Sequence, residues 1–231
     1  MINMKIHNIF PLTIIHDKIE ISDDERNKLV HNIFSSHKNS NPNHNPENAW
    51  TGDVHGYEFL LKQADFSNIA SLISKKVYEY LKVLSINTEH IDLYFQRSWA
   101  TITDKEQRIT FHTHSQSNIS FAYYLLKPVN SGGIIFRSNE PANAISKNIF
   151  IRDKLEKGLL ETNAYNANEA MFDVEQDSIL IFPSKSSHGT MPNKSGQKRI
   201  SISGDISLML KDSKGFEHLM PNYKYWQKLK S

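Results

Sequence analysis

The sequence predicts a mainly β (α+β) protein, a jelly roll or barrel supported by helices in its N-terminal part. Short runs of β-branched and aromatic residues, separated by turn residues, follow one another from about residue 89 to about residue 210. Helical periodicity is confined mostly to the residues before them. The chain shows no internal repeat and no second core. We therefore expect one domain over residues 1–231, with helical support at about 1–88, the β core, and a tail at 211–231.

The composition, with 39% hydrophobic and 23% charged residues, is ordinary for a globular protein. Because cysteine is absent, disulfides, thiolate zinc sites and cysteine nucleophiles are excluded, and a metal would be held by His, Asp or Glu. The net charge is +2 and the basic residues are scattered, so no nucleic-acid patch is recognised. We recognise no signal peptide and no transmembrane run, and therefore expect a cytoplasmic protein.

Two N-terminal segments show helical periodicity. Ser22 and Glu25 form a capping-box pattern, and apolar residues then recur at helical spacing, which predicts a helix over about 23–36. The strongest amphipathic pattern covers residues 66–84, and its apolar stripe requires a sheet to pack on. We also expect a strand at residues 5–15, where the chain enters the domain.

The β core is predicted from runs rich in β-branched and aromatic residues. The predicted strands are 91–103, 107–114, 118–126, 132–138, 170–175, 178–184 and 199–210. The interval 138–168 breaks this rhythm and contains a candidate helix at 150–160. Because long insertions between barrel strands commonly form lids or binding loops, we expect one here.

Two histidines, His112 and His114, lie two residues apart in a stretch that is predicted to be extended. Period-two alternation would place them on one face with the residues of equal parity that follow, Asn118, Ser120, Ala122 and Tyr124. The pair alone could also be the polar face of an ordinary sheet. His188, however, follows the apolar run 178–184, where a barrel would open. Three neutral imidazoles can occupy one face of an octahedral metal and leave three positions for other ligands.

Arg199 and Ser201 lie 11 and 13 residues after His188 on a predicted strand, and their equal parity gives them the same face. An inward-pointing arginine is costly to bury unless it meets an anion. A guanidinium fork with a hydroxyl is a good receptor for a carboxylate. Arg199 taken alone could reach solvent from the start of its strand, but together with the histidine spacing it indicates a carboxylate site.

These motifs resemble the Fe(II)/2-oxoglutarate-dependent oxygenase superfamily. Within it the chain is similar to a branch from bacteria and phages with an HxH...H metal motif, built around H-x-H-x-x-S-x-x-S-x-x-Y-Y-L. The resemblance covers roughly residues 50–210 and involves residues 50–53, Trp99, His112, His114, Ser117, Ser120, 123–125, 132–133, 182–184, His188 and 199–201. It implies a double-stranded β-helix, the jelly roll of the cupins.

The resemblance also implies the metal ligands. His112 would be the first iron ligand and His188 the distal one. The wider superfamily has Asp or Glu where this chain has His114, so two alternatives remain open. Either all three histidines bind the metal, which we favour from the parity of His114, or water or another anion takes the third position.

The resemblance further implies the co-substrate site and the reaction. Arg199 and Ser201 would hold the C5 carboxylate of 2-oxoglutarate, with Tyr124 and Asn118 as additional contacts. Oxidative decarboxylation of 2-oxoglutarate, with Fe(II) and O2, would then be coupled to hydroxylation of a substrate. No general base is required, so no catalytic residue is expected beyond the metal centre.

The substrate pocket is expected to include Trp99, Arg97 and Arg137, and the two arginines would suit an acidic or polar substrate. Two other interpretations compete with the oxygenase. One is a cupin-like enzyme that uses the three histidines without 2-oxoglutarate. The other is a β-sandwich that binds a metal without catalysis.

Overall fold

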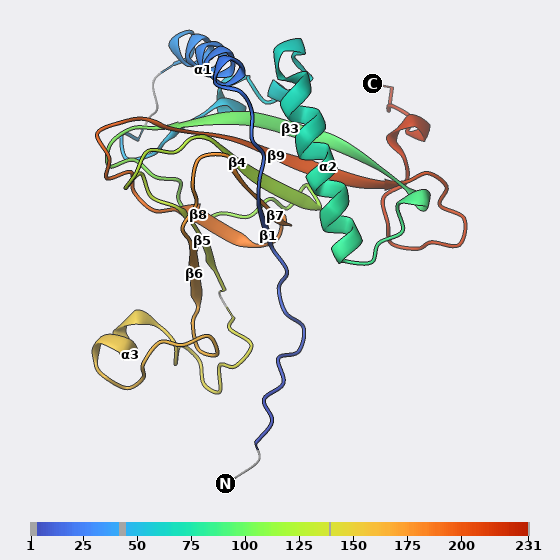
Figure 1. Ribbon diagram of the computed structural model, residues 1–231. Helices are drawn as coiled ribbons and strands as arrows, with labels where there is room; N and C mark the ends of the chain where they lie inside the picture. The colour runs from blue at the N-terminus through green and yellow to red at the C-terminus, as the bar shows by residue number, and fades with distance from the viewer. Residues whose placement is uncertain (1–3, 42–44, 139, 231) are drawn as a thin grey trace.

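Two antiparallel sheets form the body of the protein in the computed structural model, which describes residues 4–41, 45–138 and 140–230. The strands are β1 (Ile15–Lys18), β2 (Trp50–Thr51), β3 (Ile91–Thr103), β4 (Ile119–Leu126), β5 (Ile134–Arg137), β6 (Glu169–Phe172), β7 (Ser178–Pro183), β8 (Ser187–Thr190) and β9 (Arg199–Leu210). The larger sheet has the order β1-β7-β4-β9-β3-β2 and the smaller one β6-β5-β8. This is the predicted double-stranded β-helix (Figure 1).

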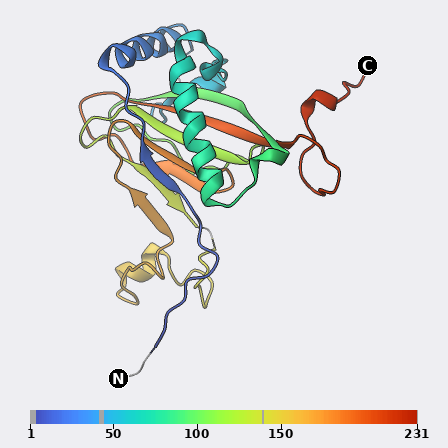
Figure 2. The same ribbon diagram turned by 45° about the vertical axis from the view of Figure 1, so that its right-hand side comes forward.

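Helices support the larger sheet on one side, as Figures 1 and 2 show for α1 (Asp23–Lys38) and α2 (Ser67–Val83). The side chain of Ser22 accepts a hydrogen bond from the Glu25 amide at the start of α1, as the capping pattern predicts. The apolar stripe of α2 is buried through Ile69, Ile73, Val77, Tyr80 and Leu81. The remaining helical segments are α3 (Arg152–Glu156) and 3-10 turns at Gly52–His55, Leu60–Lys62, Ala64–Phe66, Thr88–His90 and Tyr223–Tyr225.

Two strand predictions were wrong. The apolar segment 5–15 is not a strand apart from Ile15, where β1 begins. The part of the chain that leads to Ile15 extends away from the body (Figures 1 and 2). The segment 107–114 contains no regular strand. It pairs only through isolated bridges, Arg108 with Asn48 and His112 with His188, and the amides of His112 and His188 each donate to the other's carbonyl at 3.0 Å. β8 has no apolar pattern that sequence alone could detect, and it forms because β5 pairs with it.

A buried ion pair ties α1 to the larger sheet. Arg26 donates to both carboxylate oxygens of Asp177 at 2.9 Å, and the Tyr123 hydroxyl donates to the same carboxylate at 2.7 Å. Removing Asp177 would leave the buried guanidinium of Arg26 without its carboxylate partner. Asp177→Ala should therefore lower the free energy of unfolding by about 3–5 kcal/mol. Urea unfolding measures this difference.

The control for this prediction is Glu175→Ala. Glu175 pairs with Lys18 at the surface, where both side chains are exposed, and surface pairs contribute little. Equal unfolding midpoints for Asp177→Ala and Glu175→Ala would contradict a structural role for the buried pair.

Among the described residues, no helix has both the length and the apolar composition that crossing a bilayer requires.

Candidate metal centre

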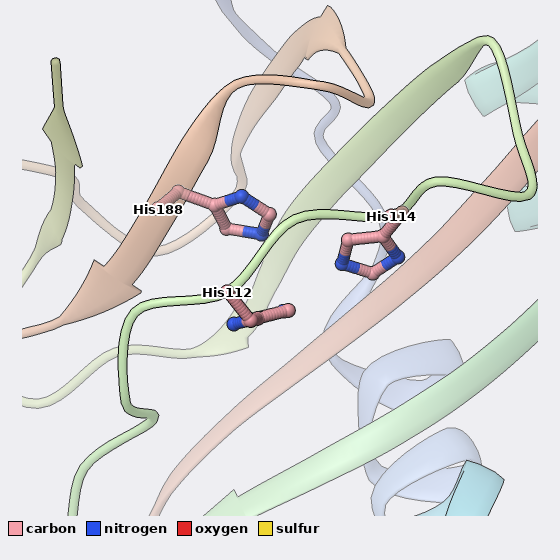
Figure 3. Close-up of side chains that lie close together, drawn as sticks. All are labelled: His112, His114 and His188. Atoms are coloured by element: carbon pink, nitrogen blue, oxygen red, sulfur yellow. The ribbon is translucent and has the colours of Figure 1, made fainter. Parts of the chain in front are cut away.

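Three histidines from two distant segments meet at one end of the β-helix. His112 and His114 come from the segment before β4, and His188 comes from β8. One ring nitrogen from each lies within 4.8 Å of the others. Figure 3 shows the three rings pointing toward one another. The structure thus brings together the three histidines that the sequence singles out.

Each histidine places its Nδ1 atom beside an oxygen. The oxygens are Thr110 O for His112 at 2.9 Å, Ser186 O for His188 at 2.9 Å and Asp205 Oδ1 for His114 at 2.7 Å. Carbonyl and carboxylate oxygens only accept hydrogen bonds, so this arrangement favours a proton on every Nδ1. Every Nε2 then keeps its lone pair, which is the atom a metal needs.

The environment keeps two of these imidazoles, His112 and His188, neutral. Burial, together with the nearby His112, lowers the pKa of His188 to about 3. Burial also lowers the pKa of His112. Both ring nitrogens of His114 are buried. Nε2 has no polar partner among the described residues, and Nδ1 lies 2.7 Å from Asp205 Oδ1 in a contact whose angle falls outside that of a regular hydrogen bond. Neutral imidazoles with a buried, unpaired nitrogen fit a first-row divalent metal well.

Asp205 is a buried carboxylate of the site that the sequence analysis missed. It lies on β9 and is fully buried. Burial would raise its pKa, but the close contact with His114 and the hydrogen bonds from Arg97 and Ser120 together lower it to about 2. The signal that could have revealed it is parity, because Asp205 is six residues after Arg199 and alternates onto the same face.

Arg199 is a buried cation, with 1% of its surface exposed. It donates to Ser131 O at 2.6 Å and to the hydroxyls of Thr190 and Thr103 at 2.9 and 3.2 Å. No carboxylate among the described residues forms an ion pair with it. Burial raises the pKa of the neighbouring Tyr124 to about 12, although the Arg199 charge opposes this shift.

A cavity of about 1450 Å³ opens beside the three histidines. Of the predicted site residues its wall contains Trp99, Arg97, Tyr124, Ser201 and all three histidines. The Trp99 ring stacks on His114, with centroids 5.8 Å apart. Thr190 also lines the cavity, so Arg199 reaches this wall through the hydroxyl that it contacts.

Besides Arg199, which lies behind Thr190, three predicted contributors do not line this cavity. Asn118 instead accepts a hydrogen bond from the Leu208 amide at 2.8 Å through its side-chain oxygen. Arg137, expected in the substrate pocket, lies over the Phe111 ring and pairs with Glu169. None of the described residues of 138–168 belongs to the cavity wall, and Figures 1 and 2 show this insertion projecting from β5 and β6. It is therefore not a lid here.

Residues 97–205 match a protein family described as "Putative 2OG-Fe(II) oxygenase". The matched segment contains the three histidines, Arg199, Ser201 and, as its last residue, Asp205. A comparison with curated proteins gave no match.

Solved structures share the fold. The non-heme alpha-ketoglutarate-dependent carbocyclase SnoK from nogalamycin biosynthesis has 10% identity and a TM-score of 0.56, covering 84% of this chain and 79% of its own. HygX from Streptomyces hygroscopicus, solved with nickel, 2-oxoglutarate and hygromycin B bound, has 11% identity and a TM-score of 0.55 over 85% of this chain and 83% of its own. The segment 97–205, which contains the histidine cluster, therefore matches the putative 2OG-Fe(II) oxygenase family, and the fold around it is one that 2-oxoglutarate-dependent enzymes share.

Proposed function

We propose that this protein couples the oxidative decarboxylation of 2-oxoglutarate to the hydroxylation of a substrate. The observation that carries the proposal is the pairing of two features within one fold. Three Nε2 atoms are free to bind one metal, and a buried guanidinium without a carboxylate partner lies near the wall of the same cavity. SnoK and SnoN, described as a carbocyclase and an epimerase, show that this fold also serves other oxidations. Hydroxylation is therefore our specific proposal.

Fe(II) would be held by His112, His114 and His188. When bound, the iron and 2-oxoglutarate supply the activation of O2. The chain's part would be to hold the three imidazoles with their protons on Nδ1, to bury two of them, and to place all three at the wall of one cavity. Because no imidazole cancels charge on the metal, such a site favours a dianionic co-substrate.

The C5 carboxylate of 2-oxoglutarate would be bound by Arg199 together with Ser201 and Tyr124. A buried guanidinium needs an anion to offset its desolvation, and the hydroxyls of Ser201 and Tyr124 belong to residues of the cavity wall. Asn118 has no part in this proposal, because its side-chain oxygen is used by the Leu208 amide.

The substrate would enter the cavity on the side of Trp99 and Arg97. Arg97 is already paired with Asp205 at 2.7 Å and lies 3.5 Å from Asp53, so it offers hydrogen bonds rather than a free positive charge. The rest of this wall carries the guanidinium of Arg108 together with amide and hydroxyl groups from Asn45, Asn48, Thr51, Gln96, Thr110 and Gln116. We therefore propose a polar, hydrogen-bonding substrate.

Anaerobic reconstitution tests the proposed function. Protein loaded with one equivalent of Fe(II) is expected to develop a weak visible charge-transfer band as 2-oxoglutarate is added, and the band should saturate at one equivalent. Succinate, which lacks the keto group that chelates the metal, is the control and should give no band. Stoichiometric Fe(II) binding with no band at any 2-oxoglutarate concentration would favour the three-histidine enzyme that does not use 2-oxoglutarate.

A further inference from the structure

We propose that Asp205 is a positioning residue that sets the tautomer of His114 and so makes this histidine a metal ligand. The proposal rests on the metal site of the proposed function. It concerns the one imidazole of the three that stands where the wider superfamily carries a carboxylate.

The three histidines differ in what fixes their rings. His112 and His188 each direct Nδ1 to the backbone carbonyl two residues before them, at 2.9 Å in both cases. His114 has no such backbone partner. Its Nδ1 faces the Asp205 side chain from β9, with the nitrogen 2.7 Å from Oδ1. The proton position on His114 therefore depends on a side chain, whereas for the other two it depends on the local backbone.

Every polar partner of Asp205 is a donor. Oδ2 accepts from Arg97 through Nη2 at 2.7 Å and from Gln116 at 3.0 Å. Oδ1 accepts from Ser120 at 2.9 Å and faces His114. Only a carboxylate, which accepts through both oxygens, satisfies all of these groups at once.

An asparagine at position 205 would have to turn its NH2 group toward one of the two sides. Arg97 is cationic and donates hydrogen bonds, so the amide oxygen of the asparagine would face Arg97. The NH2 group would then face Ser120 and His114. Ser120 can reverse its hydroxyl, but His114 must then accept through Nδ1 and carry its proton on Nε2. That proton would occupy the position where the metal binds.

Asp205 also places a negative charge close to the three-histidine cluster. The superfamily's Asp or Glu ligand would sit directly on the metal. Here a buried carboxylate sits behind His114 instead, and a carboxylate bonded to Nδ1–H makes the imidazole a stronger ligand. The arrangement combines three neutral ligands with one outer carboxylate.

The first experiment reads the tautomer in the metal-free protein. Long-range ¹⁵N–¹H correlation spectra at neutral pH should show wild-type His114 with its proton on Nδ1, and Asp205→Asn should move that proton to Nε2. His112 and His188 should stay Nδ1-protonated in both proteins and serve as internal controls. A wild-type His114 protonated on Nε2 would overturn the proposal whether or not the variant folds, and so would an unchanged tautomer in a folded variant.

The second experiment measures metal affinity. Asp205→Asn should weaken binding of Co(II), used as a spectroscopic substitute, by about 10- to 100-fold, as expected for an outer carboxylate partner. Asp53→Asn is the matched control, because it removes another carboxylate near Arg97 that forms no ion pair or hydrogen bond with the three histidines and acts on His112 only through its charge, so its affinity should stay close to the wild type. Equal affinity for Asp205→Asn and Asp53→Asn would reject the role of Asp205. If the wild type itself binds no metal, the proposed function fails, while the tautomer measurement still decides the role of Asp205.

Discussion

His188→Ala is expected to lose stoichiometric Fe(II) binding, with an affinity at least about 100-fold below the wild type. This exceeds the loss typical for an outer-shell partner because a donor atom itself is removed. His188 belongs to the cluster, since its ring centroid lies 4.4 Å from that of His112 and 5.3 Å from that of His114. Competition with a chromophoric chelator under anaerobic conditions measures the affinity.

The control is His55→Ala. His55 lines the same cavity, but it lies outside the three-histidine cluster and directs its Nδ1 to Thr51 O at 2.8 Å. Its removal should leave Fe(II) affinity unchanged. Wild-type affinity in His188→Ala, or an equal loss in His55→Ala, would mean that the metal binds elsewhere. His112→Ala should behave like His188→Ala, because both imidazoles belong to the cluster.

The sequence predicts the β core accurately where strands are long and buried. The predicted segments 91–103 and 199–210 coincide with β3 and β9, which pair along most of their length at the centre of the larger sheet. Alternation of apolar and polar residues is enough to predict these two strands, because burial of one face of a strand produces the same period of two in the sequence. The segment 5–15 has apolar residues but no partner strand over most of its length, so pattern without pairing gave the wrong prediction.

The histidine cluster was predictable from two sequence signals. His112 and His114 lie two residues apart in one segment, and His188 follows the end of a predicted apolar strand. Asp205 and Arg137 depend instead on contacts between distant segments. Asp205 meets His114 only because β9 lies beside β4, and Arg137 meets Glu169 only through the register of β5 with β6. Neither pairing register can be derived from a single sequence with a long insertion between the strands.

Arg199→Met is expected to lose 2-oxoglutarate binding while keeping Fe(II). Removing one partner of a buried, hydrogen-bonded charge pair costs about 3–5 kcal/mol. At about 1.4 kcal/mol for each factor of ten, the Kd for 2-oxoglutarate should rise at least about 100-fold. The Fe(II) affinity should not change, because Arg199 contacts none of the three histidines and interacts with Ser131, Thr103 and Thr190 instead. The charge-transfer titration measures the first quantity and chelator competition the second.

Arg199 also supports the fold, because methionine would leave Ser131 O and the two threonine hydroxyls without its donors. Arg199→Lys separates this structural part from binding. It keeps the charge but loses the two-pronged fork, so it should fold and bind 2-oxoglutarate more weakly than the wild type and more tightly than Arg199→Met. Wild-type 2-oxoglutarate affinity in both variants would place the anion site elsewhere. The buried guanidinium would then be a structural cation held by carbonyl and hydroxyl oxygens alone.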